Sequence, residues 1–266
     1  MTATQIEISA AADRLFAAQA SAVAIPPVTL DLGNELSTAY AVQEELIRRR
    51  VRGGVRRIGR KVGLTAPAVQ TQLGVDQPDF GVLLSDMILT EDDSIPWDSL
   101  ISPRIEAEIA FVMNRDVTDT RGDSILDAVA YVTPAFEIVD SRIVDWKIGI
   151  VDTIADNASS AYFVLGQERA RLQDYAPIDA RMALEENGDE VSRGSGADCL
   201  GDPINALRWV AETAAALGRP LMAGEVVLSG ALGPMVPLSP GSSYHAEISG
   251  LGSVSVTSSA SERSGE

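Results

Sequence analysis

PRIEAEIAFVMNRD, at residues 103–116, decides the fold, because it is an apolar β-type run that carries two carboxylates. Strand side chains alternate between two faces, so Glu106 and Glu108 share one face and the apolar residues around them share the other. Two buried carboxylates this close repel each other, and such a pair persists by sharing a proton or by binding a cation. The alternative is the solvated face of a half-exposed strand, but Ala110 and Val112 continue the glutamates' face as apolar residues.

A third acid, Glu137, lies in YVTPAFEIVD at residues 131–140, which is rich in β-branched and aromatic residues and therefore also indicates a strand. If the two strands are neighbours, Glu106, Glu108 and Glu137 converge. Three oxygen ligands without a nearby Cys or His suit Mg²⁺ or Mn²⁺ better than zinc. The sequence therefore predicts a site for a hard divalent cation.

Composition and charge exclude several classes of protein. The chain has 38 acidic and 21 basic residues and a formal net charge of −17, which argues against general binding to nucleic acid or to an anionic membrane. No stretch approaches the ~18 uninterrupted apolar residues of a membrane helix. The N-terminus lacks the features of a secretory leader, so we expect a cytoplasmic protein.

The single cysteine, Cys199, and the single histidine, His245, are poor candidates for catalysis. One cysteine excludes an intramolecular disulfide. His245 lies in an alternating run, where an exposed position is expected, and no G-x-S-x-G elbow supports a hydrolase triad. The glycine-rich pieces do not complete a phosphate-binding motif, so we expect no nucleotide cofactor.

The segment IRRRVRGGVRRIGRK at 47–61 is strongly basic. It fits the solvated end of a helix, or an anion-attracting rim around a site for a small carboxylate. Lys61 differs from the arginines because it begins the apolar run KVGLT. In GVDQPDFGVLL at 74–84, Asp79 is either a turn residue or a general acid or base held in an apolar wall near Lys61.

Residues 139–161 interleave acids, Arg142 and Asn157 with isoleucines and a tryptophan. Buried polar groups need partners, so this pattern predicts an internal ion-pair network that supports a site. An amphipathic surface segment is the alternative. Ser159 and Ser160, just before a strand, could donate to a substrate oxygen.

Periodicity and turn signals predict an α+β protein with a mixed, curled β-sheet, flanking helices and an N-terminal helical lobe. We expect the lobe at 1–54, a catalytic domain at 55–257 and a disordered tail at 258–266. The expected helices are 1–22, 36–52, 65–73 and 202–218; the expected strands are 55–64, 86–89, 103–114, 131–139 and 161–166, with a hairpin around Asn187-Gly188 and β structure over 224–257.

Several blocks together resemble one family, in the same order along the chain. They are R-K-V-G-L-T at 60–65, G-V-D-Q-P-D-F-G at 74–81, P-R-I-E-A-E-I-A-F at 103–111, E-I-V-D-S-R-I-V-D-W-K-I at 137–148, D-T-I-A-D-N-A-S-S at 152–160, A-G-E-V-V-L-S-G at 223–230 and S-G-L-G-S-V-S-V at 249–256. The pattern is similar to the 2-hydroxypenta-2,4-dienoate (2-keto-4-pentenoate) hydratases of aromatic meta-cleavage pathways and to the related 4-oxalocrotonate decarboxylases.

This resemblance implies a fumarylacetoacetate-hydrolase-like β-roll and a divalent metal, Mg²⁺ or Mn²⁺, held by three carboxylates. Carried over by motif, the ligands are Glu106, Glu108 and Glu137, Lys61 and Asp79 are the acid/base residues, and Ser160 lies near the substrate. The implied substrate is a small 2-oxo or 2-hydroxy dienoate. The resemblance also implies a homo-oligomer, and a complex with a paralogous decarboxylase or a downstream aldolase is an option.

The resemblance leaves three activities open. The ending L-S-G-A-L-G-P-M-V-P-L at 228–238 favours a hydratase, and the core motifs offer no obvious extra cation for the second carboxylate of a decarboxylase substrate. We therefore expect water addition that gives 4-hydroxy-2-oxopentanoate, with the decarboxylase and a non-catalytic partner subunit as alternatives. L-G-D-P at 200–203 departs from the His-Pro common in the family, so no role is carried over to a histidine there.

Overall fold

The computed structural model describes residues 3–66, 70, 75 and 77–262. The helices are α1 (Gln5–Ser21), α2 (Thr29–Leu32), α3 (Leu36–Arg52), α5 (Ile150–Ala155) and α6 (Pro203–Ala216). Short 3₁₀ turns lie at Trp97–Ser99, Leu126–Ala128, Val144–Trp146, Asn157–Ser159, Leu172–Asp174, Pro177–Asp179 and Gly196–Asp198. Within these residues no helix is both long and apolar enough to cross a membrane.

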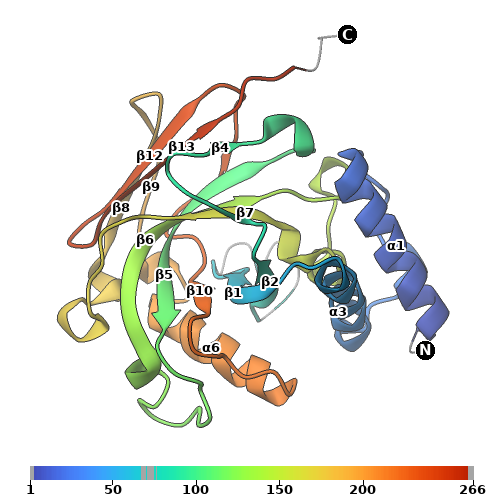
Figure 1. The fold of residues 1–266 in the computed structure, drawn as a ribbon, viewed down its shortest axis with the longest axis horizontal. Coiled ribbons are helices and arrows are strands. Elements are labelled where there is room, and N and C mark those ends of the chain that lie inside the picture. The colour runs from blue at the N-terminus through green and yellow to red at the C-terminus, as the bar shows by residue number, and fades with distance from the viewer. Residues whose placement is uncertain (1–2, 67–69, 71–74, 76, 263–266) are drawn as a thin grey trace.

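The strands form two sheets that curl around a common core (Figure 1). The larger sheet has the order β2 (Asp79–Leu84), β1 (Arg57–Gly63), β10 (Val226–Leu228), β5 (Arg104–Met113), β6 (Val129–Val139), β7 (Ser160–Leu165) and β3 (Ile88–Leu89), with β11 (Val236–Pro237) paired to β5. The smaller sheet has the order β4 (Ser94–Ile95), β13 (Gly252–Ser258), β12 (Ser243–Ile248), β8 (Arg181–Glu186) and β9 (Asp189–Ser195).

The antiparallel pair β5–β6 is the centre of the larger sheet. Both strands are almost entirely buried, since the core covers one face and the interior of the curled sheet covers the other. Their register places Glu106 directly opposite Glu137. The predicted neighbourhood of these two strands is confirmed, and so is the α+β class with a curled, mixed sheet.

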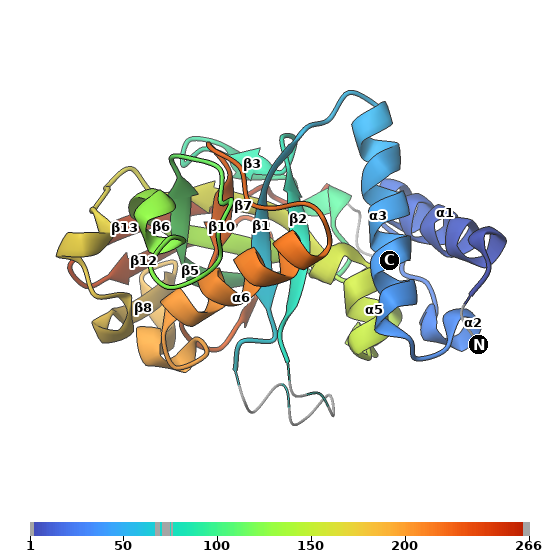
Figure 2. The same cartoon turned by 90° about the horizontal axis from the view of Figure 1, so that it is seen from below.

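Helices cover the outside of the larger sheet. Figure 2 shows α6 lying across the strands near β1 and α3 standing beside β2. Helix α6 begins as predicted, since the Asp202 carboxylate accepts a hydrogen bond from the Ile204 amide at 2.9 Å and Pro203 occupies the first helical position. Helix α1 begins at a capping box between Thr4 and Glu7.

The helical lobe has an apolar cluster of its own, which α1, α2 and α3 share with α5. Ile143, Val151 and Ile154, which lie far along the chain, belong to this cluster. The lobe is therefore packed onto a segment that follows β6, and a division of the chain at residue 54 stays a prediction.

Residues 79–84 form the fully buried strand β2, which pairs with β1, so the apolar wall around Asp79 is confirmed although no strand was expected there. Two local expectations were wrong. The polar segment 139–161 contains the helix α5, which the alternating charges concealed. The tail was expected to begin at residue 258, but Ser258 ends β13 and the Ser259 amide donates to the Ile95 carbonyl.

Two further expectations fall on the edges of the described chain. Most of the predicted helix at 65–73, and the end of the tail at 263–266, lie outside the described residues.

The predicted hairpin is confirmed: Asn187 and Gly188 have φ of 53° and 88°, the left-handed pair that a two-residue turn between β8 and β9 requires.

Candidate active site

Three carboxylates converge on one face of the β5–β6 pair. Glu106 and Glu108 are two residues apart on β5, and Glu137 lies opposite Glu106 on β6. One oxygen from each carboxylate lies within 4.8 Å of the others. The side chains of Glu108 and Glu137 have no exposed surface, and Glu106 is partly exposed. The sequence prediction that the three acids meet is thus matched by the fold.

The hydrogen bonds around these carboxylates are incomplete. Glu108 Oε2 accepts from the Gly230 amide at 2.7 Å, but Glu108 Oε1 and Glu137 Oε1 have no partner among the described residues. Burial, and then the charge of Glu137, raises the pKa of Glu106 to about 7 and raises the pKa of Glu108 well above its usual value. Buried acids with unused oxygens are what a hard divalent cation would compensate, so the residues fit such an ion.

Lys61 supplies the positive charge beside this cluster. It is 3 % exposed, and its Nζ lies 3.1 Å from Glu137 Oε2. Burial alone would lower the pKa of Lys61, but the surrounding carboxylates, Glu137 first and Asp79 next, raise it above its ordinary value. Lys61 therefore carries a positive charge in this environment.

Asp79 lies on the neighbouring strand β2, opposite Gly63 of β1. Its carboxylate fills the space above Gly63, where an added Cβ would lie 2.2 Å from Asp79 Oδ1. Oδ2 accepts from the Thr153 hydroxyl at 3.2 Å, and Oδ1 has no partner among the described residues. Burial raises the pKa of Asp79 and the charge of Lys61 opposes that rise, so Asp79 is suited to take and release a proton.

Glu106 of the acidic cluster, together with Lys61 and Asp79, lines a cavity of about 370 Å³, here called the active-site cavity. Lys61, Asp79, Glu106 and Thr153 supply part of its polar wall, and its apolar lining is Leu64, Val139, Trp146, Ile148 and Met235. Arg104 also lines it, with its guanidinium 4.6 Å from the centre of the Trp146 ring. The expectation that the motifs offer no extra cation was therefore wrong, because Arg104 faces the same cavity as Glu106.

The two candidate serines, Ser159 and Ser160, have different surroundings although they are adjacent in the chain. Ser159 lines the active-site cavity, whereas Ser160 is buried beside Glu137, where it helps to oppose the rise that burial causes in the pKa of Glu137. Asn157, Ala158 and Ser159 all have positive φ, between 51° and 56°, a conformation that non-glycine residues rarely adopt. This left-handed turn is what directs Ser159, rather than Ser160, to the cavity.

The predicted internal polar network exists in part. Arg142 is buried and binds the Asp156 carboxylate, the Asp140 carbonyl and the Ser160 carbonyl. Asn157 hydrogen-bonds both the amide and the carbonyl of Val82. Asp145 and Lys147 are instead exposed and pair with each other, so the prediction was wrong for these two residues. The network holds the left-handed turn against β2 and β6.

Sequence reasoning missed two residues of this site. Arg104 could have been found, since it precedes Glu106 by two positions and therefore shares its face of β5. Thr153 could not, because 74 residues separate it from Asp79 and only the packing of α5 against β2 joins them.

The remaining candidates lie elsewhere. His245 is exposed on β12 of the smaller sheet, with Nδ1 2.9 Å from the Ser255 hydroxyl. Cys199 is buried, donates to the Ser229 carbonyl, and has a pKa that burial raises. Arg49 and Arg50 at the end of α3 pair with nearby acids, as a solvated helix end does.

Comparison with known proteins agrees with this geometry. Residues 54–257 match the family model described as fumarylacetoacetate (FAA) hydrolase C-terminal. The chain is 49% identical over 259 residues to the TodF product hydratase of Pseudomonas putida strain F1, covering 95% of this chain and 96% of the relative. It is also 49% identical over 253 residues to the 2-keto-4-pentenoate hydratase of Burkholderia vietnamiensis strain G4, covering 94% and 97%.

Among solved structures, the 4-oxalocrotonate decarboxylase of Pseudomonas putida G7 superposes with a TM-score of 0.92 at 32% identity, covering 96% of this chain and 98% of that one. That structure is complexed with magnesium and adipate. A second structure of the same decarboxylase, with a TM-score of 0.90, is complexed with calcium and acetate.

Proposed function

The chain belongs to the fumarylacetoacetate hydrolase family, and from this premise we propose that it works as a metal-dependent hydratase of aromatic meta-cleavage catabolism. It is an enzyme of the lyase class that adds water to 2-hydroxypenta-2,4-dienoate (2-oxopent-4-enoate) to give 4-hydroxy-2-oxopentanoate. The observation that carries the metal dependence is the cluster of Glu106, Glu108 and Glu137, which keeps unused buried oxygens beside Lys61 and Asp79.

Glu106, Glu108 and Glu137 would hold a divalent cation, Mg²⁺ or Mn²⁺. When bound, such an ion supplies Lewis-acid stabilisation for negative charge that develops on the 2-oxygen of the substrate. Mg²⁺ is favoured because the related decarboxylase is complexed with magnesium and all three ligands are carboxylates. The Gly230 amide fixes the orientation of Glu108, and Lys61 holds Glu137.

Asp79 and Lys61 are the proton-handling pair. Ketonisation of the dienol moves a proton to carbon 5 and leaves a double bond between carbons 3 and 4, conjugated with the 2-oxo group. Water then adds at carbon 4, which requires a base to accept a proton from water and an acid to deliver one to carbon 3. Asp79, with one carboxylate oxygen unused, is the proton carrier, and the ammonium of Lys61 stabilises its charged form.

The cavity walls fit a substrate that is anionic at one end and apolar at the other. Arg104 and Lys61 provide positive charge, and Trp146, Leu64 and Met235 provide an apolar wall for the vinyl end. Ser160, buried beside Glu137, is the serine that the motif comparison places near the substrate, and the buried hydroxyl of Ser159 lines the cavity next to it. Because Arg104 could also pair with a second carboxylate, decarboxylation of 2-oxohex-3-enedioate is the alternative.

The assembly and location of the enzyme are also part of the proposed function. The relatives are bacterial catabolic enzymes, and we place this chain in the cytoplasm as a homo-oligomer. A complex with a paralogous decarboxylase would pass the short-lived dienol to this enzyme, and a complex with a downstream aldolase would receive the product, 4-hydroxy-2-oxopentanoate.

Two substrates given in parallel test the reaction. Metal-stripped protein receives Mg²⁺ and then either 2-hydroxypenta-2,4-dienoate or 2-oxohex-3-enedioate, while dienol absorbance and carbon dioxide are followed. We expect metal-dependent loss of the first substrate without carbon dioxide. Carbon dioxide from the second substrate alone would identify a decarboxylase, and no turnover of either would indicate a non-catalytic partner subunit.

A further inference from the structure

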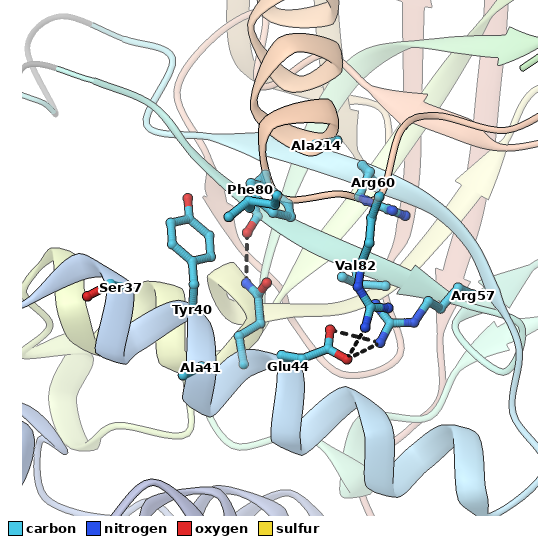
Figure 3. A pocket seen from close by; sticks show the side chains of 12 residues that line it. Ser37, Tyr40, Ala41, Glu44, Arg57, Arg60, Phe80, Val82 and Ala214 are labelled. Atoms are coloured by element: carbon cyan, nitrogen blue, oxygen red, sulfur yellow. Dashed lines mark hydrogen bonds and ion pairs between the residues drawn. The ribbon is translucent and has the colours of Figure 1, made fainter. Parts of the chain in front are cut away.

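A second cavity, of about 240 Å³, lies behind the active site between α3, α6 and the strands β1 and β2 (Figure 3). We call it the arginine cavity, because Arg57, Arg60 and Arg219 all line it. Its apolar walls are Tyr40, Phe80 and Leu217. It is smaller than the roughly 300–1,000 Å³ of drug-sized pockets, so it suits a small organic molecule.

The arginine cavity carries more positive than negative charge. Arg57 Nη2 donates to Glu44 Oε1 at 2.8 Å (Figure 3), and Arg219 Nη2 donates to the same oxygen at 2.7 Å. Arg60, which is 4 % exposed, has Glu225 as its acidic partner, at 3.2 Å. Three guanidinium groups thus face two carboxylates, which leaves one positive charge for a monoanion. Glu44 itself would repel a dianion.

The chemistry of the walls narrows the ligand further. Tyr40 stacks on Phe80 with ring centroids 5.0 Å apart, and Leu217 adds an aliphatic surface. Guanidinium groups bind carboxylates through charge-assisted hydrogen bonds, and Arg57 Nη2 already donates to both carboxylate oxygens of Glu44, at 2.8 and 2.9 Å. The matching ligand has one carboxylate and a flat or compact apolar body.

Strands β1 and β2 separate the arginine cavity from the active-site cavity. Arg60 is paired with Val82, and both face the arginine cavity; the next pair along, Lys61 and Gly81, belongs to the opposite face. Phe80 lines the arginine cavity, while its neighbour Asp79 lines the active-site cavity. Burial raises the pKa of Tyr40, and the negative charge of Asp79 adds to the rise, so the two sites interact electrostatically.

A hydrogen-bonded side chain also links the two cavities. Gln43 of α3 donates to the carbonyls of Phe80 at 2.8 Å and Ile154 at 3.1 Å. Ile154 follows Thr153, whose hydroxyl donates to Asp79. Asp79 is held by its own strand β2 and by the Thr153 hydroxyl of α5. A ligand that shifts α3 relative to β2 therefore acts on both of these segments.

We propose that the arginine cavity is an effector site for a small monocarboxylate with an apolar body, and that its occupancy changes turnover through β2 and Asp79. Arg57 and Arg219 bind the ligand carboxylate in competition with Glu44, and the Tyr40–Phe80 stack contacts its apolar body. This assignment concerns a site distinct from the metal cluster and does not depend on which reaction the enzyme catalyses.

Benzoate is the probe for binding, measured by isothermal titration calorimetry of metal-free protein in a chelator, so that no cation can attract it to the active site. We expect a Kd on the order of 1 mM, as for other ligands of this size. Arg219→Gln should weaken binding about tenfold or more, because a charge-assisted hydrogen bond is lost. The matched control is Arg208→Gln, an arginine of α6 that pairs with Asp123 outside the cavity.

Two further binding measurements show which cavity benzoate occupies. Glu106→Gln should bind benzoate as the unmodified protein does, and the neutral analogue benzyl alcohol should bind at least about tenfold more weakly than benzoate. Loss of benzoate binding in Glu106→Gln, equal binding of benzyl alcohol, or unchanged binding in Arg219→Gln would each overturn the assignment.

Kinetics test the coupling. With Mg²⁺ and saturating substrate, benzoate should change kcat by about fivefold or more, the lower end of typical coupling between sites, and this effect should be absent in Arg219→Gln. Benzoate that only raises KM competes at the active site, and benzoate that binds without changing kcat has no regulatory effect; either result would overturn the effector role.

Discussion

Glu108 and Glu137 have no exposed surface, yet each keeps a carboxylate oxygen without a partner among the described residues. A single ammonium, that of Lys61, cannot neutralise three clustered acids, so the metal-free site stores electrostatic repulsion. This imbalance at individual residues is the physical reason that we propose a cation of charge two for the site.

Glu106→Gln keeps the size of the side chain but removes one ligand charge. We expect the fold to be retained, the affinity for Mg²⁺ to fall more than about 100-fold, since even outer-shell changes cost 10- to 100-fold, and hydration to be abolished. Glu247→Gln, at an exposed position on β12, is the matched control. Full turnover in Glu106→Gln would remove this residue from the metal site.

Asp79→Asn separates proton transfer from metal binding. Asn can still accept from the Thr153 hydroxyl, but it cannot take a proton from water. We expect kcat to fall by about 10² to 10⁴, the usual contribution of a general base, with Mg²⁺ affinity changed less than about twofold. Asp92→Asn, on an exposed turn, is the control; equal turnover in both variants would exclude Asp79 from the mechanism.

At the scale of elements, the site depends on how the left-handed turn at Asn157–Ser159 meets β2. Asn157 Oδ1 accepts from the Val82 amide at 2.8 Å, and Nδ2 donates to the Val82 carbonyl at 2.9 Å. The Asn157 carbonyl also lies close above Gly81, where an added Cβ would be 2.5 Å away. The turn therefore closes the edge of β2 in the way that another strand would.

Asn157→Ala should destabilise the protein by about 2–4 kcal/mol, because two buried backbone groups lose their partners and alanine tolerates positive φ less well than asparagine. Urea unfolding measures the loss. Asn205→Ala, which removes one exposed hydrogen bond to Leu200, is the control and should cost less than about 1 kcal/mol. A similar midpoint for both variants would show that the turn does not depend on this side chain.

For the whole molecule, the buried acids couple metal binding to stability and pH. The pKa of Glu106 is about 7 in the fold, against an ordinary value of 4.5. At a pH below 4.5, the Glu106 carboxyl group is protonated in both the folded and the unfolded state. As pH rises toward and past about 7, the unfolded state releases its proton more readily, so the metal-free protein loses stability across this interval.

We expect the Tm of metal-free protein to fall on the order of 5 °C between about pH 5 and pH 7.5. Mg²⁺ binds only the folded state, so it should raise Tm more at the higher pH. Thermal scans with and without a chelator measure both effects, and Glu106→Gln should show a smaller fall. A Tm of metal-free protein that rises over this range would contradict the burial of uncompensated acids.

The sequence by itself determined the strands that carry the acids. Period-two alternation placed Glu106 and Glu108 on one face, and the asparagine–glycine turn and the proline at the start of α6 fixed local structure, because these signals act between near neighbours. The family motifs identified the same three acids together with Lys61 and Asp79.

Only the tertiary structure decided how distant segments meet. It paired Glu106 with Glu137, brought Thr153 to Asp79, directed Ser159 rather than Ser160 to the cavity, and placed Arg219 beside Arg57 behind the active site. These contacts arise from sheet register, from a strained turn held by Asn157, and from helix packing. Each contact is stabilised by packing between segments that lie far apart in the chain, and no local sequence pattern encodes such packing.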